Sequence, residues 1–411
     1  MSPRRRVRLA PSDDATHHLT GPFLPQTPLS SPRALSPVSP TAKAWAARPV
    51  SPYLRWAIQP ASAAKLLLVP VVLYANWHLT GPFLAPGWAN PFAPFFLISG
   101  RVPSSAPDDP RYQKSYLDLV FIAYNVVFFS FVRQIIVLKI CNPIARYFGL
   151  RKSGKIERFG EQGYALAYFG FFGAWGYVTL FLFLSWPFLT PSSASCPSSR
   201  HTGTRPNYPH WDMNPELKRY YLMQMAYWLQ QLLVLVLGLE KPRKDYAELV
   251  AHHIVTLWLV GWSYLMNLTL IGNAVYMSMD IPDAFLAFSK ILNYIQWNRA
   301  KVFAFVVFLV VWSYFRHWLN FRILWSVWDE IPLMPESSKT WDAARGVYFP
   351  WWMTYQVFTP LLLLQFLNLF WYMLMLRILK RALFTDNASD IRSDDEDEGE
   401  DDNDAKKAEK K

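Results

Sequence analysis

The 411-residue sequence contains little cysteine and little charge. Its two cysteines, Cys141 and Cys196, are too few for a disulfide framework or a cysteine-based metal site, and the topology expected below places them on opposite sides of a membrane. Charged residues make up only 17% of the chain, which does not suit a soluble globule with this apolar content. No apolar signal-peptide core follows the basic start at residues 1–6, so we expect the first apolar run to act as an uncleaved anchor.

Apolar and aromatic residues are abundant instead, at 52% and 17% of the chain. Eight apolar runs lie near residues 62–82, 116–139, 163–187, 219–238, 250–270, 272–294, 301–323 and 353–378. Each is long enough for a helix across a hydrocarbon core of about 30 Å, and none has the alternating pattern of a barrel strand. The sequence therefore predicts an all-α polytopic membrane helix bundle with about eight transmembrane helices.

Basic residues are concentrated in the loops at 140–162, 239–249 and 295–301, after the last run, and at the N-terminus. With eight spans, all of these positions fall on one side of the membrane, and the positive-inside tendency makes that side cytosolic for both termini. Arg316 and Arg322 lie against this trend, at the far end of the seventh run. The formal net charge of +11 therefore reflects orientation rather than nucleic-acid binding.

The two ends of the chain are polar. Residues 1–55 are rich in Pro and Ser and residues 386–411 are acidic, so neither end can bury enough apolar surface to become ordered. We expect both ends to be disordered cytosolic segments. Ser389 and Ser393 in the acidic tail are candidate phosphorylation sites.

Two neighbouring apolar runs carry side chains that a bilayer penalises. His252 and His253 lie near the start of the fifth run, and Asp280 and Asp283 lie three residues apart in the sixth. Each group costs roughly 2.5–3.5 kcal/mol on insertion scales, so a chain keeps it there mainly where it faces a protein interior and has a function. A turn at 271–273 is expected to join the two runs, although Asp283 would then lie deeper in the membrane than the histidines.

Further polar residues share these faces, because a helix turns by about 100° per residue. The face of His252 continues through Thr256, Ser263 and Asn267, and that of the aspartates through Lys290 and Tyr294. Single Thr, Ser and Asn residues in such helices are alternatively plain helix–helix contacts.

A histidine that a carboxylate orients has one basic nitrogen, which can deprotonate an amine or hydroxyl or attack an activated acyl group itself. Both routes are acyl transfer. Two histidines and two aspartates are also a metal-ligand set, although adjacent histidines on a helix diverge by about 100° and are poor joint ligands. A proton or ion relay in a transporter is a third interpretation.

The polar residues form one long motif. With its spacings it is His252-His253-x2-Thr256-x6-Ser263-Tyr264-x2-Asn267, then Gly272, then Asp280-x2-Asp283-x2-Leu286-x3-Lys290-x2-Asn293-Tyr294. This pattern resembles the Lag1 motif of ceramide synthases, which belong to the TLC-domain membrane family. Met279 stands where many animal members have a histidine, and in this the chain is similar to the fungal Lag1/Lac1 branch.

The resemblance implies an endoplasmic-reticulum enzyme that N-acylates a sphingoid base, sphinganine or phytosphingosine, with a fatty acyl-CoA and releases CoA. It implies N-terminal membrane spans at 56–149 and a TLC catalytic domain at 150–385. The family's catalytic residues would be His252, His253, Asp280 and Asp283. Substrate-pocket candidates are Thr256, Ser263, Tyr264, Asn267, Lys290, Asn293 and Tyr294.

The anionic head of CoA could be received by Lys241, Arg243 and Lys244, just before the histidines, or by the basic cluster at 146–158. No metal and no cofactor is expected beyond the acyl-CoA co-substrate. Expected partners are membrane lipid, the sphingoid base, a small accessory membrane subunit as in the fungal branch, and a second copy in a dimer. Two alternatives remain: a non-catalytic lipid sensor or transporter of the same family, and an acyltransferase for another amine or hydroxyl acceptor.

Overall fold

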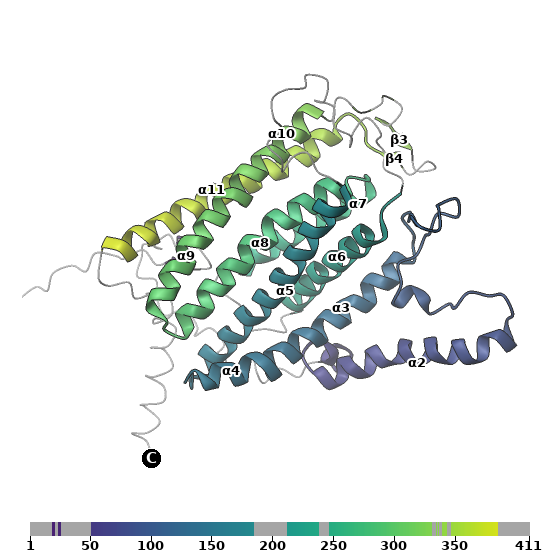
Figure 1. Cartoon of the computed structure of the whole chain (residues 1–411), viewed down its shortest axis with the longest axis horizontal. Coiled ribbons are helices and arrows are strands. Elements are labelled where there is room, and N and C mark those ends of the chain that lie inside the picture. The colour runs from purple at the N-terminus through teal and green to yellow at the C-terminus, as the bar shows by residue number, and fades with distance from the viewer. Residues whose placement is uncertain are drawn as a thin grey trace, which may run out of the picture. The chain divides into compact units, whose positions relative to one another are not determined.

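The computed structural model describes residues 19–20, 24–25, 51–184, 212–237, 246–330, 334, 336, 339–342 and 347–384 (Figure 1). The chain divides into two compact units. One comprises Arg48–Pro242 and Tyr246–Tyr372, and the other comprises Met1–Ala47, Arg243–Asp245 and Met373–Lys411. Cys196, the CoA-head candidates Lys241, Arg243 and Lys244, and the tail serines Ser389 and Ser393 lie outside the described residues.

The larger unit is built from helices. In chain order these are η1 (Pro52–Ala57), α2 (Pro60–Leu84), η2 (Ala93–Phe95), α3 (Asp118–Ile135), η3 (Ile136–Cys141), α4 (Asn142–Tyr147), α5 (Ser153–Leu184), α6 (Pro215–Val236), α7 (Tyr246–Leu265), α8 (Thr269–Tyr294), α9 (Asn298–Trp312), η5 (Ser313–Leu319), α10 (Asn320–Glu330) and α11 (Met353–Phe384), whose end belongs to the smaller unit. η3 and η5 are π-helical segments. α5 packs along α8, α8 along α9, and α3 along α6 (Figure 1).

Strands are short in the described residues. β3 (Trp341–Asp342) pairs antiparallel with β4 (Val347–Tyr348) before α11. In the smaller unit, β1 (Leu19–Thr20) pairs antiparallel with β2 (Leu24–Pro25), within the segment that the sequence predicts to be disordered.

Four described helical stretches are long and apolar enough to cross a membrane: Pro60–Leu84, Asp118–Tyr147, Asn298–Asp329 and Met353–Lys380. The second and third run through the π-helical segments η3 and η5 without a break. The protein is thus an all-α, multi-pass membrane protein. The other four predicted spans correspond to α5, α6, α7 and α8, which are long helices with more polar sequences.

The turn between α7 and α8 differs from the prediction. It lies at 266–268, and Asn267 adopts a φ of 58°, a left-handed conformation that Asn tolerates better than most residues. The predicted turn at 271–273 is therefore wrong, because these residues lie in the first turns of α8. Gly272 serves close packing instead, since a Cβ there would collide with the hydroxyl groups of Tyr221 and Ser263.

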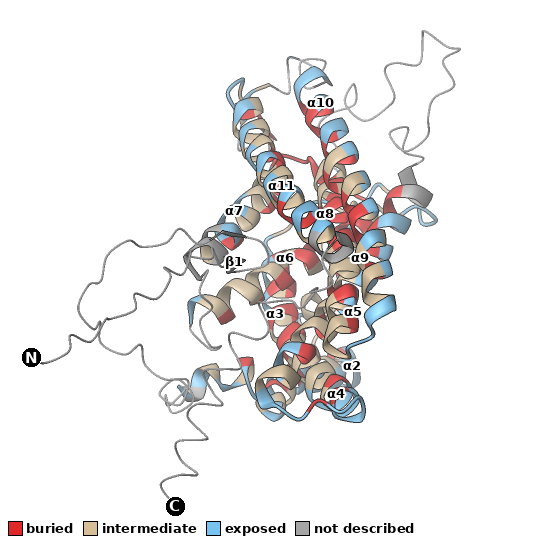
Figure 2. Ribbon diagram, turned by 90° about the vertical axis from the view of Figure 1, so that its left-hand side faces the viewer, coloured by how far each residue is buried: buried red, intermediate tan, exposed pale blue. Residues whose placement is uncertain are grey.

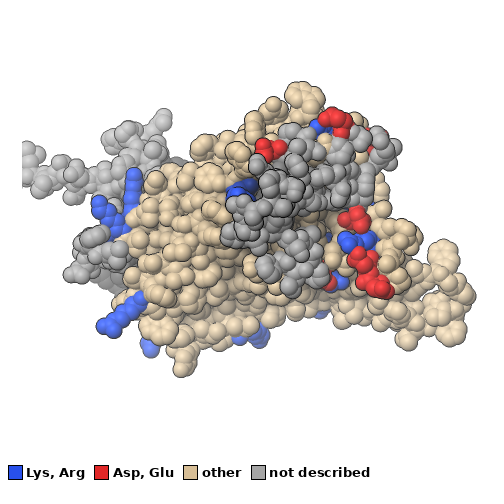
Figure 3. Space-filling model, turned by 45° about the horizontal axis from the view of Figure 1, so that its top comes forward, with Lys and Arg blue, Asp and Glu red and all other residues tan. Residues whose placement is uncertain are grey.

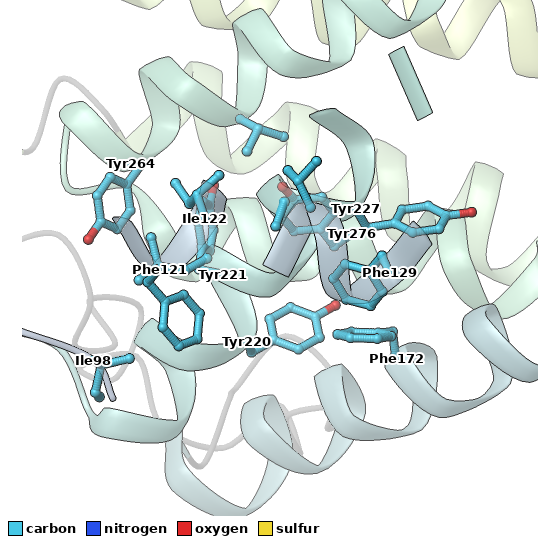
Figure 4. Packing of buried hydrophobic residues seen from close by; sticks show 14 of the residues in the cluster. Ile98, Phe121, Ile122, Phe129, Phe172, Tyr220, Tyr221, Tyr227, Tyr264 and Tyr276 are labelled. Carbon is cyan, nitrogen blue, oxygen red and sulfur yellow. The ribbon is translucent and has the colours of Figure 1, made fainter. Parts of the chain in front are cut away.

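Burial is concentrated on the inner helices. Buried side chains lie along α6 and α8 (Figure 2). In contrast, α2 is exposed over most of its length. Figure 4 shows the aromatic core where α3, α5 and α6 meet, with Tyr220 of α6 beside Phe172 of α5 and Phe129 of α3. The exposed apolar side chains of α2 suit contact with lipid, because in apolar surroundings their exposure carries no hydrophobic cost.

Charged side chains are unevenly placed on the surface. On the face that Figure 3 shows, Asp and Glu lie in the right-hand half beside Lys and Arg, whereas only Lys and Arg are coloured at the left-hand end. An asymmetry of this kind is typical of a membrane protein whose two ends face different compartments.

A buried ion pair fixes the start of α6. Asn214 caps this helix by accepting from the backbone N–H of Glu216. One turn later the Nζ of Lys218, which is fully buried, lies 2.9 Å from Asp118 Oδ1 at the start of α3 and donates to the carbonyls of Ser99 and Gln113. The pair therefore joins α3, α6 and the loop before α3.

Candidate functional site

The two histidines lie on α7 and contact one residue of α6. His253 is buried, whereas His252 is exposed. The ring of Trp228 lies edge-on to both, with centroid distances of 5.9 Å to His252 and 5.6 Å to His253. The imidazole planes are nearly perpendicular, at 89°, as expected for adjacent residues that diverge on a helix.

Asp280 of α8 is fully buried and is held by a neutral amide. Its Oδ2 accepts from Gln224 Nε2 of α6. Gln224 is held in turn, because its Oε1 accepts from the hydroxyl of Tyr168 at 2.7 Å and its Nε2 also donates to the hydroxyl of Tyr220 at 3.0 Å. Gln224 lies one turn before Trp228, so a single face of α6 contacts both the buried carboxylate and the histidines.

Asp283 makes an ion pair with a residue from a later span. Its Oδ1 lies 2.7 Å from Arg316 Nη2, and the same nitrogen donates to the carbonyl of Met279 at 3.1 Å. Arg316 lies on the π-helical segment η5, a distortion that often marks functional sites. Its guanidinium also stacks over the ring of Trp312, at 4.4 Å from the centroid.

The observed turn places the histidines and the aspartates at the same depth. His252 precedes Leu265, the last residue of α7, by 13 residues, and Asp283 follows Thr269, the first residue of α8, by 14. At about 1.5 Å per residue, both positions lie roughly 20 Å from the turn. The difference in depth that the sequence suggested therefore came from the wrong position of the turn.

The structure thus brings the two histidines and the two aspartates into one region, but the carboxylates have hydrogen-bond partners that the sequence did not predict. Within the described residues, the hydrogen bonds to the two carboxylates come from Gln224 and Arg316 rather than from an imidazole. The charge of Arg316 acts on both His252 and Asp280, so the guanidinium connects the two halves of the site electrostatically. No group of three His, Cys, Asp or Glu residues suited to a metal ion occurs in the described part of the chain.

The polar residues farther along α7 contact the protein itself. Thr256 Oγ1 donates to the carbonyl of His252 in its own helix. Ser263 Oγ accepts from the hydroxyl of Tyr221 at 2.6 Å, and the hydroxyl of Tyr264 donates to Asp118 at 2.9 Å. Asn267 lies buried in the turn, not on the helical stripe that the sequence suggested.

The remaining candidates lie toward the other end of α8. Lys290 acts electrostatically on Asp283 and so adjoins the site. Asn293 Oδ1 accepts from Lys301 Nζ at 3.2 Å, and Tyr294 packs against the apolar cluster around Cys141. The structure thus separates Asn293 and Tyr294 from the polar residues at the end of α7.

Three site residues were missed from the sequence: Gln224, Trp228 and Arg316. Only Arg316 carried a signal, because an arginine within an apolar run that also contradicts the charge rule requires a buried partner. Glutamine and tryptophan are unremarkable in a membrane helix, so the roles of Gln224 and Trp228 depended on packing.

Imidazoles, carboxylates and a guanidinium inside a membrane helix bundle define a membrane protein with a partly buried acid–base site. The chain belongs to the TLC-domain family, whose model matches residues 158–377. It is 38% identical over 343 residues to sphingosine N-acyltransferase lac1 of Schizosaccharomyces pombe, which covers 82% of this chain and 83% of that protein. It is 36% identical over 340 residues to ceramide synthase LAG1 of Saccharomyces cerevisiae, with coverages of 82% and 77%.

A third relative is the sphingosine N-acyltransferase-like protein FUM17 of Gibberella moniliformis, at 38% identity over 334 residues and 80% of each chain. All three relatives are fungal proteins, and the resemblance found in the sequence motif is confirmed.

Proposed function

We propose that this chain is a ceramide synthase, which N-acylates a sphingoid base with a fatty acyl-CoA to give ceramide and CoA. The observation that carries the proposal is the placement of His252 and His253 at the depth of Asp280 and Asp283 within the matched domain. The fungal relatives named as sphingosine N-acyltransferases support the choice of substrate class.

The reaction joins the amine nitrogen to the thioester carbonyl carbon and breaks the carbon–sulfur bond. The nitrogen loses one proton and the departing sulfur gains one, so a single imidazole can carry the proton between them. The same imidazole can instead take the acyl group first and pass it to the amine. We assign either role to His252, because it is exposed to an incoming substrate while His253 is buried beside it.

Each carboxylate has a distinct part in this scheme. We assign Asp283, which pairs with Arg316, to stabilising an imidazolium, and we assign Asp280, which Gln224 holds, as a second buried acid. A thioester is already activated, so the reaction requires no metal or cofactor beyond acyl-CoA itself. Lys241, Arg243 and Lys244 lie close before the histidines in the sequence, and we assign them to the phosphates of CoA.

The topology that suits this chemistry has about eight spans, formed by α2, α3–α4, α5, α6, α7, α8, α9–α10 and α11. Residues 56–149 then supply the N-terminal spans and 150–385 the catalytic domain. Both termini face the cytosol from the endoplasmic-reticulum membrane, which brings His252 toward the side where acyl-CoA arrives. A small accessory membrane subunit and a dimer belong to the same proposal. Glycosylation acceptors inserted at 103–107 would be modified in this topology, whereas acceptors inserted at 148–152, between α4 and α5, would not.

The full chain in lipid-supplemented detergent, mixed with acyl-CoA and sphinganine, should release free thiol and form the amide in equal amounts. His252→Ala and Asp283→Ala should each abolish amide formation while leaving the protein folded. His78→Ala on α2, whose ring contacts Tyr74, is the matched control and should keep wild-type turnover. Wild-type turnover in His252→Ala would refute the assignment.

The alternatives give different products in the same assay. A lipid sensor or transporter releases no CoA with any acceptor. An acyltransferase for another amine or hydroxyl releases CoA with that acceptor only, and mass spectrometry of an acceptor panel identifies it.

A further inference from the structure

A second polar network joins η5 and α10 to α11 in the middle of the membrane helices. Ser313 donates to the hydroxyl of Tyr372 at 2.8 Å, and Arg316 donates to Asn368 at 3.3 Å. We call the following set the α11 network: Ser313, Arg316, His317, Asn320, Gln365, Asn368 and Tyr372, all within the larger unit. Arg316 lies 18 residues from Asn298 and 13 from Asp329, the ends of its span, so the network is far from either membrane surface.

The hydrogen bonds within the α11 network fix the state of His317. Asn320 Nδ2 donates to Gln365 Oε1 at 2.7 Å, which leaves Gln365 Nε2 as the donor to His317 Nδ1 at 3.0 Å. A neutral imidazole that accepts at Nδ1 carries its proton at Nε2. The Nε2–H of His317 is therefore a donor, and it is buried with no partner in the part of the chain that the structure describes.

Unpartnered polar atoms gather around this network. The buried donors of η5 and α11 and of the preceding Trp312 that have no partner among the described residues are Trp312 Nε1, Arg316 Nε, His317 Nε2, Asn368 Nδ2 and Trp371 Nε1, and the acceptor is Asn320 Oδ1 of α10. Arg316, Asn320 and Asn368 are more than nine-tenths buried. Unpaired groups are expensive in a bilayer and rare in native proteins. Five donors and one acceptor together favour a ligand rich in oxygen.

The α11 network adjoins the reaction site through Arg316, which pairs with Asp283 at 2.7 Å. Its edge is partly exposed: the side chain of Asp283 is 27% exposed, and His317 and Tyr372 are partly exposed. Another group of unpartnered atoms among the described residues lies around Asn273 and Tyr276.

That second group lies where α5 and α8 approach closely. A Cβ on Gly176 would lie 2.7 Å from the hydroxyl of Tyr220 and 3.3 Å from Asn273 Oδ1, and one on Gly173 would lie 2.9 Å from Ile281. No substrate group fits between helices in such contact.

The chemistry of the substrates indicates which group the α11 network would bind. The acyl chain has no hydrogen-bonding atoms, and the phosphates of CoA belong to the aqueous surface. We propose that the α11 network binds the hydroxyl-bearing head of the long-chain amine, which places the adjacent amine nitrogen beside Asp283 and His252. This inference rests on the proposed function. The head's hydroxyl oxygens accept from the donors of Arg316, His317 and Asn368, and one hydroxyl donates to Asn320.

The test compares amines within each protein preparation. Sphinganine is compared with its 1-deoxy and 3-deoxy analogues, each lacking one hydroxyl, at saturating acyl-CoA with the full chain. The ratio of kcat/KM for two amines is independent of the folded fraction, because that fraction cancels. One lost hydrogen bond corresponds to about a fivefold change. The wild-type protein should prefer sphinganine to at least one analogue by at least about that factor.

Asn368→Leu and His317→Phe should each bring this ratio close to one by slowing sphinganine and not the analogue. His317→Phe keeps an aromatic ring against Tyr372, where the centroids lie 4.9 Å apart. The matched control is Asn125→Leu, since buried Asn125 donates only to its own helix at Phe121, and it should keep the wild-type ratio.

An unchanged ratio in both network variants, or a wild-type ratio near one for both analogues, would overturn the proposal and indicate that water satisfies these atoms. If the wild-type protein forms no amide from any of the three amines, the proposed function itself fails, and the subsite with it.

Discussion

The buried ion pair between Lys218 and Asp118 offers a quantitative test of the packing around the site. The Lys218 ammonium makes three close contacts: it lies 2.9 Å from Asp118 Oδ1 and donates to the carbonyls of Ser99 at 2.7 Å and Gln113 at 2.5 Å. Lys218→Met removes these contacts and leaves a buried carboxylate without a counter-charge. Breaking such a pair typically costs about 3–5 kcal/mol.

The structure places this change at the lower end of that range. Asp118 Oδ2 keeps two donors in the variant, the backbone N–H of Ser115 at 2.8 Å and the hydroxyl of Tyr264 at 2.9 Å. We therefore expect Lys218→Met to lower the free energy of unfolding by about 3 kcal/mol. The double variant Lys218→Met/Asp118→Asn should lose less than the sum of the single variants by about 2 kcal/mol, because no unpaired charge remains.

Unfolding in mixed micelles with increasing SDS, followed by the fluorescence of the 19 tryptophans, measures these differences. The neighbouring Arg219→Met is the control: it breaks a half-exposed pair with Glu216 at 2.9 Å and should cost less than about 1 kcal/mol. Additive losses in the double variant, or a Lys218→Met variant as stable as the control, would refute this account of the interior.

Two further predictions concern the site and the loop before α3. Gln224→Leu should lower the free energy of unfolding by about 2 kcal/mol, because Asp280 and the hydroxyl of Tyr168 lose their hydrogen-bond partner. It should also slow amide formation at least tenfold. Normal turnover would show that Asp280 does not need this hydrogen bond. Burial lowers the pKa of Lys114, which donates to the carbonyl of Leu265, from 10.5 to about 8. Between about pH 8 and 10.5 the folded protein then binds fewer protons than the unfolded chain. The wild-type protein should therefore gain stability relative to Lys114→Met as the pH rises through this window. A difference in melting temperature that stays constant with pH would contradict this prediction.

The sequence was informative where a residue conflicts with its surroundings. His252, His253, Asp280 and Asp283 stand out because hydrocarbon penalises them, and the structure brings them to one depth. Arg316 gave the same signal, although its partner Asp283 lies 33 residues away and no local pattern connects the two. Gln224 conflicts with nothing, so only the packing of α6 against α8 reveals that it holds Asp280.

The same heptapeptide occurs at 18–24 and at 78–84, and it shows that local sequence alone does not determine secondary structure. At the second position the seven residues end helix α2, with Pro82 inside it. At the first position, Leu19, Thr20 and Leu24 belong to the strand pair β1–β2. The surroundings select the conformation, because the intrinsic preferences of the seven residues are the same at both positions.

By itself, the sequence determined that the protein is an α-helical membrane protein, because apolar runs of this length allow no other backbone solution in lipid. It also identified the two neighbouring helices that carry the histidines and the aspartates. Only the tertiary structure decided where α7 turns into α8, which side chain holds each carboxylate, and which polar groups of α11 adjoin the site. Those outcomes depend on contacts between spans distant in sequence, and one turn of helix, about 5.4 Å, is enough to change every one of them.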